Sequence, residues 1–300
     1  MKRMFHTIVL AVLCSHTCFG QAGGREWLNL NYAGDEKEYH NLDIHLPTIV
    51  KPAYKAIIVI YGSAWFGNNM KQFAFEALGK PLLESGFAVI AINHRSSSDA
   101  PYPAQINDVK AAVRFLRAHA DDYHIDASFI GITGFSSGGH LASLAGTSND
   151  VKVCTINGVS ADIEGSVGSH PTYSSAVNAV VDWFGPIDMA RMDNCKGPKE
   201  GDSPEAALIR GNPADNLEMI ALLNPITFLD ESDPQFLVIH GDADNVVPHC
   251  QSELFADALQ EKGLLNAFIS VPEGQHGPVT FNESSFGKMT DFFLKEAAEK

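Results

Sequence analysis

Two kinds of hydrophobic pattern recur along the chain and predict two kinds of β-strand. Residues 28–32 and 41–46 alternate apolar and polar side chains, which is typical of strands that cover a core on one face only. The polar break between these two segments predicts an antiparallel hairpin. Six further runs are apolar almost throughout, as expected of strands buried on both faces of a parallel sheet: 56–61, 87–92, 129–133, 178–184, 236–240 and 267–271. The pattern therefore predicts eight strands.

Segments with helical spacing separate these strands. Residues 106–119 carry apolar side chains on one face, as in an amphipathic helix, and residues 72–85 show helical spacing that stops at Gly86. Further helices are expected at 141–145, 251–262 and 284–299. This alternation predicts an α/β fold, a mostly parallel, doubly wound eight-stranded sheet with the antiparallel hairpin at its N-terminal end. The chain has 300 residues of which 45% are hydrophobic, so we expect residues 21–300 to form a single domain.

A glycine- and serine-rich segment joins the strand predicted at 129–133 to the helix that follows it. Gly134, Ser136 and Gly138 form the Gly-x-Ser-x-Gly pattern of a nucleophile elbow, in which a tight turn lifts a serine hydroxyl from the carboxyl end of a sheet. A Cβ at either glycine would collide with the neighbouring strand or helix. An ordinary Gly/Ser loop can match these positions by chance, but the strand before and the helix after favour the elbow. Ser136 is therefore the predicted nucleophile.

A serine hydroxyl is a poor nucleophile at neutral pH, so the elbow predicts a histidine base and an orienting acid, in the chain order Ser, acid, His. Asp244 lies in the turn after the strand predicted at 236–240 and is the expected acid. Asp242 in the same turn is the alternative, and both could instead cap the next helix. His276 lies in a glycine-flanked loop after the last strand and is the expected base. His140, beside the elbow, is expected to be a packing residue.

Catalysis of acyl transfer also needs N–H donors for the negative charge that develops on the substrate oxygen. The backbone N–H of Ser137, directly after the nucleophile, is one predicted donor. The turn after the first buried strand predicts two more, the N–H groups of Ser63 and Ala64. Tyr61 and Trp65 flank that turn and are assigned to substrate contact. The alternative is an ordinary loop with a buried Trp65.

Two stretches after the elbow helix, 149–175 and 189–203, lack a regular hydrophobic pattern. Insertions in a sheet of this kind tend to lie over the carboxyl ends of the strands. We therefore expect these stretches to wall the substrate pocket, and whether they form a lid stays open.

The first twenty residues have the pattern of a secretory signal peptide. Two basic residues precede the apolar run 8–13, which is too short to span a bilayer, and small residues follow. We expect residues 1–20 to be removed after Gly20, and the protein to be exported to the periplasm or the medium. A lipoprotein signal at Cys14 or Cys18 is the alternative, although the residues before each cysteine are not the small ones expected there.

Charge and cysteine content narrow the partners further. The formal net charge of −15 argues against nucleic acid or an anionic membrane as a partner and favours neutral substrates.

Outside the predicted signal peptide the chain keeps Cys154, Cys195 and Cys250, enough for one disulfide in an exported protein. Cys195 and Cys250 lie in loop-like surroundings and are the candidate pair. No Cys-x-x-Cys or His/Cys cluster suggests a metal site, so neither a metal nor another cofactor is expected.

Several segments together resemble a known family. Tyr-Gly-Ser-Ala-Trp at 61–65, the segments 101–108 and 181–188, Gly-Phe-Ser-Ser-Gly-Gly-His at 134–140 and Gly-x-x-Asp-x-x-Val-Pro around Asp244 are similar to α/β-hydrolases of the esterase/lipase group. The closer resemblance is to the bacterial feruloyl and acetyl xylan esterases of the BD-FAE type, and it covers nearly the whole chain after residue 20. The family has His-Gly-Gly-Gly-Trp where this chain has 61–65. This departure should keep the backbone donors but narrow the turn.

The resemblance implies an α/β-hydrolase fold and a serine esterase that removes acetyl or feruloyl groups from plant cell-wall polysaccharide or its oligosaccharides. A general short-chain carboxylesterase or lipase is the nearest alternative, and a prolyl-type peptidase is more distant because a large second domain is missing. A binding protein with an inactive site is a further alternative, which the intact set of Ser136, Asp244 and His276 argues against. The acyl group, the sugar and the oligomeric state stay open.

Overall fold

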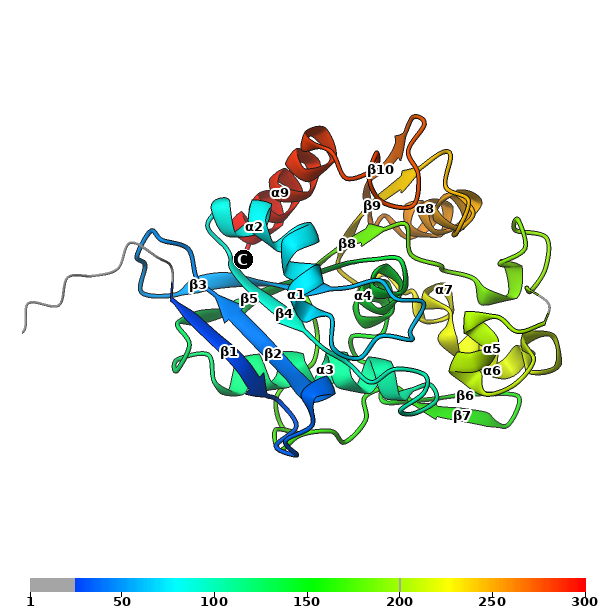
Figure 1. Ribbon diagram of the computed structural model, residues 1–300, viewed down its shortest axis with the longest axis horizontal. Coiled ribbons are helices and arrows are strands. Elements are labelled where there is room, and N and C mark those ends of the chain that lie inside the picture. Colours follow the sequence, from blue (N-terminus) through cyan, green and yellow to red (C-terminus); the bar gives the residue numbers. More distant parts are fainter. Residues whose placement is uncertain (1–24, 200) are drawn as a thin grey trace, which may run out of the picture.

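The computed structural model describes residues 25–199 and 201–300, so the predicted signal peptide at 1–20 lies outside the described residues. Eight strands form one sheet in the spatial order β1-β2-β4-β3-β5-β8-β9-β10 (Figure 1). Their bounds are β1 Glu26–Asn31, β2 Asn41–His45, β3 Tyr54–Ile60, β4 Ala88–Ile92, β5 Ile125–Phe135, β8 Ala179–Trp183, β9 Gln235–Gly241 and β10 Leu265–Val271.

The strand directions confirm the predicted sheet. β1 pairs antiparallel with β2, and β2 pairs antiparallel with β4, while every other neighbouring pair in the sheet is parallel. In the centre, Ile58 of β3 pairs with Ile90 of β4 and Ile132 of β5, and all three side chains are buried. These apolar runs form strands because helices cover both faces of the sheet and leave no polar face.

Helices flank the sheet in two layers (Figure 1). Their bounds are α1 Lys71–Ala74, α2 Lys80–Glu84, α3 Ala104–Ala118, α4 Ser137–Thr147, α5 Pro204–Ile209, α6 Leu217–Leu223, α7 Pro225–Phe228, α8 Cys250–Lys262 and α9 Glu283–Ala298. Side chains of α1, α2 and α9 pack into one hydrophobic cluster on the sheet, and those of α3, α4 and α8 pack into another. A π-helical turn, Phe75–Gly79, joins α1 to α2. The residues predicted as a helix at 72–85 therefore form one continuous helical segment with a wider turn in its middle.

The stretch at 149–175 is less irregular than expected, because it contains a two-stranded hairpin. β6 Val153–Ile156 pairs antiparallel with β7 Val159–Asp162. Asn157 and Gly158 form the turn, both with positive φ, at 47° and 88°. Asn-Gly is a strong hairpin signal because both residues tolerate the left-handed conformation of a type I′ turn. Asn157 and Gly158 are thus a local signal for this hairpin in the sequence.

The segment before β9 also contains structure that the sequence reading left unassigned. α5 begins after Ser203, whose hydroxyl accepts a hydrogen bond from the Ala206 N–H at 3.1 Å, with Pro204 in the first helical position. Serine as the N-cap followed by proline is a recognised start signal for a helix. α6 and α7 follow it and pack on the α4 side of the sheet.

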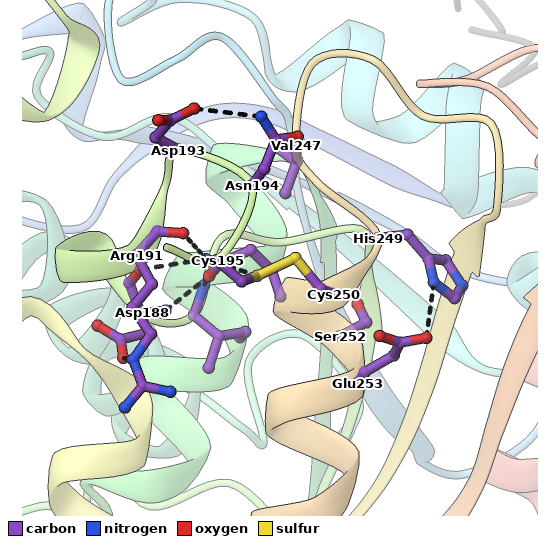
Figure 2. The surroundings of a disulfide bond; sticks show 12 residues. Asp188, Arg191, Asp193, Asn194, Cys195, Val247, His249, Cys250, Ser252 and Glu253 are labelled. Carbon is purple, nitrogen blue, oxygen red and sulfur yellow. Dashed lines mark hydrogen bonds and ion pairs between the residues drawn. A yellow bond between two sulfur atoms is a disulfide. The ribbon is translucent and has the colours of Figure 1, made fainter. Parts of the chain in front are cut away.

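A disulfide joins Cys195 to Cys250, the pair expected from the sequence (Figure 2). The disulfide links the loop that follows a short 3₁₀ helix, Met189–Arg191, to the first residue of α8. Cys154, the third cysteine of the described chain, is a partly buried thiol. Within residues 25–199 and 201–300, no helix is long and apolar enough to cross a membrane.

Candidate active site

Ser136 occupies a strained turn between β5 and α4. Its backbone has φ 56° and ψ −127°, a conformation that L-residues rarely adopt and that persists only where the surrounding structure enforces it. A Cβ on Gly134 would overlap the backbone of Gly138, and a Cβ on Gly138 would overlap the carbonyl oxygen of Ile60. Both glycines are therefore required by the close approach of strand, turn and helix. The local structure is the predicted elbow.

The structure brings together the three residues that the sequence selects. His276 Nε2 lies 2.9 Å from Ser136 Oγ, and His276 Nδ1 lies 2.7 Å from Asp244 Oδ2. With Nδ1–H donating to the carboxylate, Nε2 is free to accept the proton of the serine hydroxyl. Asp242, the alternative acid, instead accepts the Glu273 N–H at 2.7 Å through Oδ1, so it supports the loop that carries His276.

Asp244 is held as a buried carboxylate. Its side chain is fully buried, and its Oδ1 accepts the N–H groups of Val246 at 2.8 Å and Val247 at 3.1 Å. Burial opposes ionisation, but hydrogen bonds from His240, His276 and the Val246 N–H outweigh it and lower the pKa of Asp244. The group that faces His276 Nδ1 is therefore negatively charged at neutral pH.

The predicted oxyanion donors are not equivalent. The Ser63 N–H donates to Ser137 Oγ at 2.8 Å, so a protein partner already occupies it. Ala64, with φ 50°, lines the cavity at Ser136, and its N–H makes no hydrogen bond within the described chain. Ser137 is the first residue of α4, where N–H groups have no partner inside the helix. The N–H groups of Ala64 and Ser137 are thus the better placed pair.

Tyr61 and Trp65 do not reach the substrate cavity, so the structure does not support the substrate contacts assigned to them. Tyr61 is 0% exposed and stacks on His94 at 4.8 Å between ring centroids. Trp65 is 2% exposed and donates from Nε1 to His140 Nδ1 at 3.2 Å. His140 in turn donates from Nε2 to the Leu223 carbonyl at 2.9 Å, and burial lowers the pKa of His140 to about 4. These rings support the turn from inside.

The cavity beside Ser136 and His276 measures about 720 Å³ and is mainly apolar. Four phenylalanines line it: Phe73 of α1, Phe135 of β5, and Phe184 and Phe281 from loops. The ring centroids of Phe135 and Phe281 are 5.6 Å apart in an edge-to-face arrangement. A cavity lined by these four aromatic rings is suited to an apolar acyl group.

The stretches 149–175 and 189–203 contribute none of the described lining residues of this cavity, contrary to expectation. The first packs along α3 instead, where Asn107 Nδ2 donates to the Asp162 carbonyl at 2.8 Å. The end of the second lines a different cavity of about 660 Å³, together with the half-exposed Phe66. The substrate cavity is walled by α1 and its π-helical turn because these lie beside the turn at 62–64.

No group of three or more histidine, cysteine, aspartate or glutamate side chains that could hold a metal ion occurs among residues 25–199 and 201–300. The groups gathered at Ser136 are a hydroxyl, an imidazole, a carboxylate and backbone N–H donors, the set required for acyl transfer through a serine.

A serine presented by a strained strand-to-helix turn, with its histidine and acid supplied by later loops, is shared by α/β-hydrolases. The fold and the site thus define the class of the protein as an α/β-hydrolase. A comparison with known families then narrows the class, because the model of the BD-FAE family matches residues 42–259. The chain belongs to the BD-FAE family, as the resemblance implied.

Curated relatives are esterases and related enzymes. Esterase LipQ of Mycobacterium tuberculosis is 30% identical over 240 residues, which cover 78% of this chain and 53% of the relative. Endo-1,4-beta-xylanase B of Butyrivibrio fibrisolvens is 30% identical over 182 residues, 60% of this chain and 25% of that protein. The chain therefore spans about half or less of the length of these relatives.

Solved structures are similar over most of the chain. A bifunctional GH43-CE protein of Bacteroides eggerthii is 64% identical with a TM-score of 0.90, over 91% of this chain and 35% of that one. A truncated carbohydrate esterase from gut microbiota is 54% identical with a TM-score of 0.91, over 92% and 98% of the two chains. A carbohydrate esterase and an esterase are thus among the proteins that this chain is similar to.

Proposed function

We propose that this protein is an exported serine esterase that removes acetyl or feruloyl groups from plant cell-wall polysaccharide or its oligosaccharides. The observation that carries the proposal is the hydrogen-bonded chain Ser136, His276 and Asp244 at the edge of an apolar cavity. A second support for the substrate class is the 64% identity to the protein described as a bifunctional GH43-CE.

The proposed mechanism is a two-step acyl transfer. Ser136 Oγ attacks the ester carbonyl carbon while His276 Nε2 takes the hydroxyl proton, and the carbonyl oxygen becomes an oxyanion facing the N–H groups of Ala64 and Ser137. When the oxyanion collapses, the carbon–oxygen bond to the alcohol breaks, and His276 gives its proton to the leaving oxygen. Asp244 keeps Nδ1 protonated and stabilises the imidazolium that forms.

Water then repeats the sequence on the acyl-enzyme. His276 Nε2 accepts a proton from water, the resulting hydroxide adds to the acyl carbon, and the second oxyanion uses the same donors. Collapse releases the carboxylic acid, and the imidazolium returns the proton to Ser136 Oγ. The box of Phe73, Phe135, Phe184 and Phe281 would hold the acyl group through both steps.

Two features support the proposed export. Residues 1–20 have the pattern of a secretory signal peptide. The Cys195–Cys250 disulfide would be stable in the periplasm or outside the cell, because cytosolic reductants keep most thiols reduced. Mass analysis of the protein recovered from its host would test this, and we expect a chain that begins at Gln21. A retained N-terminus would contradict export by signal cleavage.

The function is tested with acetylated, feruloylated arabinoxylan. Released acetate and ferulate are quantified for the wild-type protein and for Ser136→Ala, which removes only the hydroxyl. We expect release by the wild type and a loss on the order of 10⁶ in turnover for the variant, the scale known for a serine protease. A fluorophosphonate should label the wild type but not Ser136→Ala.

The outcomes separate the alternatives. Release that persists in Ser136→Ala would contradict the mechanism. Cleavage of a small activated acetate ester without release from arabinoxylan would keep the mechanism and favour the general short-chain carboxylesterase. Absence of both hydrolysis and fluorophosphonate labelling would favour the inactive binding protein.

A further inference from the structure

A second, fully buried histidine lies beside Asp244, where His276 also binds. His240, near the end of β9, is 0% exposed, and its Nε2 lies 3.2 Å from Asp244 Oδ2 and 3.1 Å from the Val247 carbonyl oxygen. Its Nδ1 lies 2.7 Å from the hydroxyl of Ser252, which is also fully buried, on α8. Both ring nitrogens therefore have partners.

These contacts determine the protonation of the His240 ring. Nε2 faces two acceptors, a carboxylate oxygen and a carbonyl oxygen, so Nε2 carries the hydrogen. Burial lowers the pKa of His240 more than the hydrogen bond from its ring to Asp244 raises it, which keeps the ring neutral. Nδ1 then has a lone pair and accepts the hydrogen bond from the Ser252 hydroxyl. The two acceptors at Nε2 therefore select the tautomer that donates to Asp244, and the Ser252 hydroxyl holds the ring by donating to Nδ1.

The same oxygen of Asp244 receives both imidazoles. Oδ2 accepts from His276 Nδ1 at 2.7 Å and from His240 Nε2 at 3.2 Å, while Oδ1 accepts the N–H groups of Val246 and Val247. Four donors thus determine the rotation of the carboxylate and the direction in which Oδ2 faces His276. Without His240, His276 would be the single donor to Oδ2. The carboxylate of Asp244 could then rotate away from the orientation in which Oδ2 faces His276.

We propose that His240, held by Ser252, is a positioning residue that orients Asp244 toward His276, so that the hydrogen-bonded chain runs Ser252, His240, Asp244, His276 and Ser136. This inference rests on the proposed function, in which His276 is the base. His240 contacts neither the cavity at Ser136 nor Ser136 itself, and it acts only through the carboxylate.

Besides Asp244 and His276, which meet at the same carboxylate oxygen, His249 is a titratable group beside the His240 ring. The ring centroids of His249 and His240 are 5.3 Å apart, and His249 Nε2 lies 2.9 Å from the Ser270 hydroxyl. His249 Nδ1 is turned toward Glu253 at 3.3 Å (Figure 2). Phe184, which follows β8, approaches His240 from another side and is apolar. The donor that His240 offers to Asp244 is therefore protected from solvent and from competing acids.

The test compares His240→Leu, which removes the donor, with His240→Gln, whose side-chain amide can still donate to Asp244. The assay uses a small activated acetate ester and the full protein. We expect His240→Leu to lower kcat by about 10- to 100-fold with KM nearly unchanged, because a misplaced acid affects the proton transfer and not substrate binding. His240→Gln should recover most of the loss.

The pH profile separates positioning from a general loss of packing. Removing the His240 hydrogen bond lets the carboxylate of Asp244 turn away from His276, so the carboxylate stabilises the imidazolium less. The acid limb of kcat/KM should therefore move to lower pH in His240→Leu and return toward the wild-type position in His240→Gln. His45→Leu is the matched control, because His45 is also buried, on β2, and its Nδ1 lies 3.0 Å from a carboxylate oxygen of Glu26. It should lose stability without a change in the profile.

Ser252→Ala extends the test to a variant that keeps the ring in place. Loss of the hydroxyl leaves Nδ1 without its hydrogen-bond donor and holds the ring less firmly, so we expect a several-fold lower kcat at constant KM. Wild-type kcat and pH profile in folded His240→Leu, or in Ser252→Ala if the leucine variant fails to fold, would overturn the inference. Activity that persists in Ser136→Ala would instead overturn the proposed function, so the two failures are distinguishable.

Discussion

A buried carboxyl beneath the first turn of α4 should make the stability of this protein depend on pH. Asp182 of β8 is 0% exposed and packs against the backbone of Gly139. Its Oδ1 accepts the Gly185 N–H at 3.0 Å, and its Oδ2 has no hydrogen-bond partner within the described chain. Burial raises the pKa of Asp182 to about 7, because the ionised form would lose its hydration.

The sign of the effect follows from the protons bound in each state. Between about pH 4 and pH 7 the folded protein keeps a proton on Asp182 that the unfolded chain releases, so the free energy of unfolding falls as the pH rises through this window. We compare each pH with strongly acidic pH, where Asp182 is protonated in both the folded and the unfolded state. With a folded pKa of about 7, Asp182 lowers the free energy of unfolding by roughly 1.5 kcal/mol at pH 5 and by about 4 kcal/mol at pH 8. Asp182→Asn cannot ionise. Its stability relative to wild type should therefore increase by about 2.5 kcal/mol between these two pH values.

The measurement is urea unfolding followed by tryptophan fluorescence at pH 5 and pH 8, for wild type, Asp182→Asn and Asp257→Asn. Asp257 is exposed on α8, so the control carries the same chemical change without the burial. Asp233, whose pKa burial also raises to about 7, is present in all three proteins and cancels in the comparison. A difference between Asp182→Asn and wild type that is the same at both pH values would refute the reasoning.

Three further predictions follow from the packing. Gly134→Ala places a Cβ on the backbone of α4 and should prevent folding or lower the free energy of unfolding by several kcal/mol. Gly287→Ala, on α9 with open space around it, should instead raise the free energy of unfolding by about 0.5–1 kcal/mol. Chemical denaturation of both variants measures these changes. Removing the disulfide with Cys195→Ser and Cys250→Ser opens a loop of 55 residues and should cost up to about 4 kcal/mol, measured as a lower urea midpoint that reductant no longer affects. Phe281→Ala should lower kcat/KM for a feruloyl ester by up to about tenfold more than for an acetyl ester, since an aromatic pair contributes roughly 0.5–1.5 kcal/mol; equal losses on both esters would contradict an aromatic acyl contact.

Local sequence was sufficient for most of the fold because the decisive signals are local. Continuous apolar runs such as 56–61 can be buried only on both faces, and Gly134 and Gly138 are needed wherever a strand turns sharply into a helix. The hairpin around Asn157 and Gly158 carried an equally local signal. The hydrophobic pattern does not predict its strands, because they are short and their side chains alternate only weakly.

The positions of Ser136, Asp244 and His276 could be selected for a similar reason. Each follows a predicted strand, and the carboxyl ends of parallel strands meet at one edge of the sheet, so three distant segments were expected to converge. The structure places them within hydrogen-bond distance of one another. The choice between Asp242 and Asp244 also agrees with the structure, although only the three-dimensional arrangement shows that Asp242 holds the Glu273 N–H instead.

The sequence by itself therefore determined the eight strands of the main sheet, the turn at Ser136 and the choice of Ser136, His276 and Asp244 as nucleophile, base and acid. Only the tertiary structure decided how the groups of the segment 61–65 are directed: the rings of Tyr61 and Trp65 inward to His94 and His140, and the backbone N–H of Ser63 to Ser137 Oγ. It also revealed His240 behind the acid. The physical reason is that backbone conformation follows local sterics and hydrophobic period, whereas the partner of a buried polar group depends on which distant segment packs beside it.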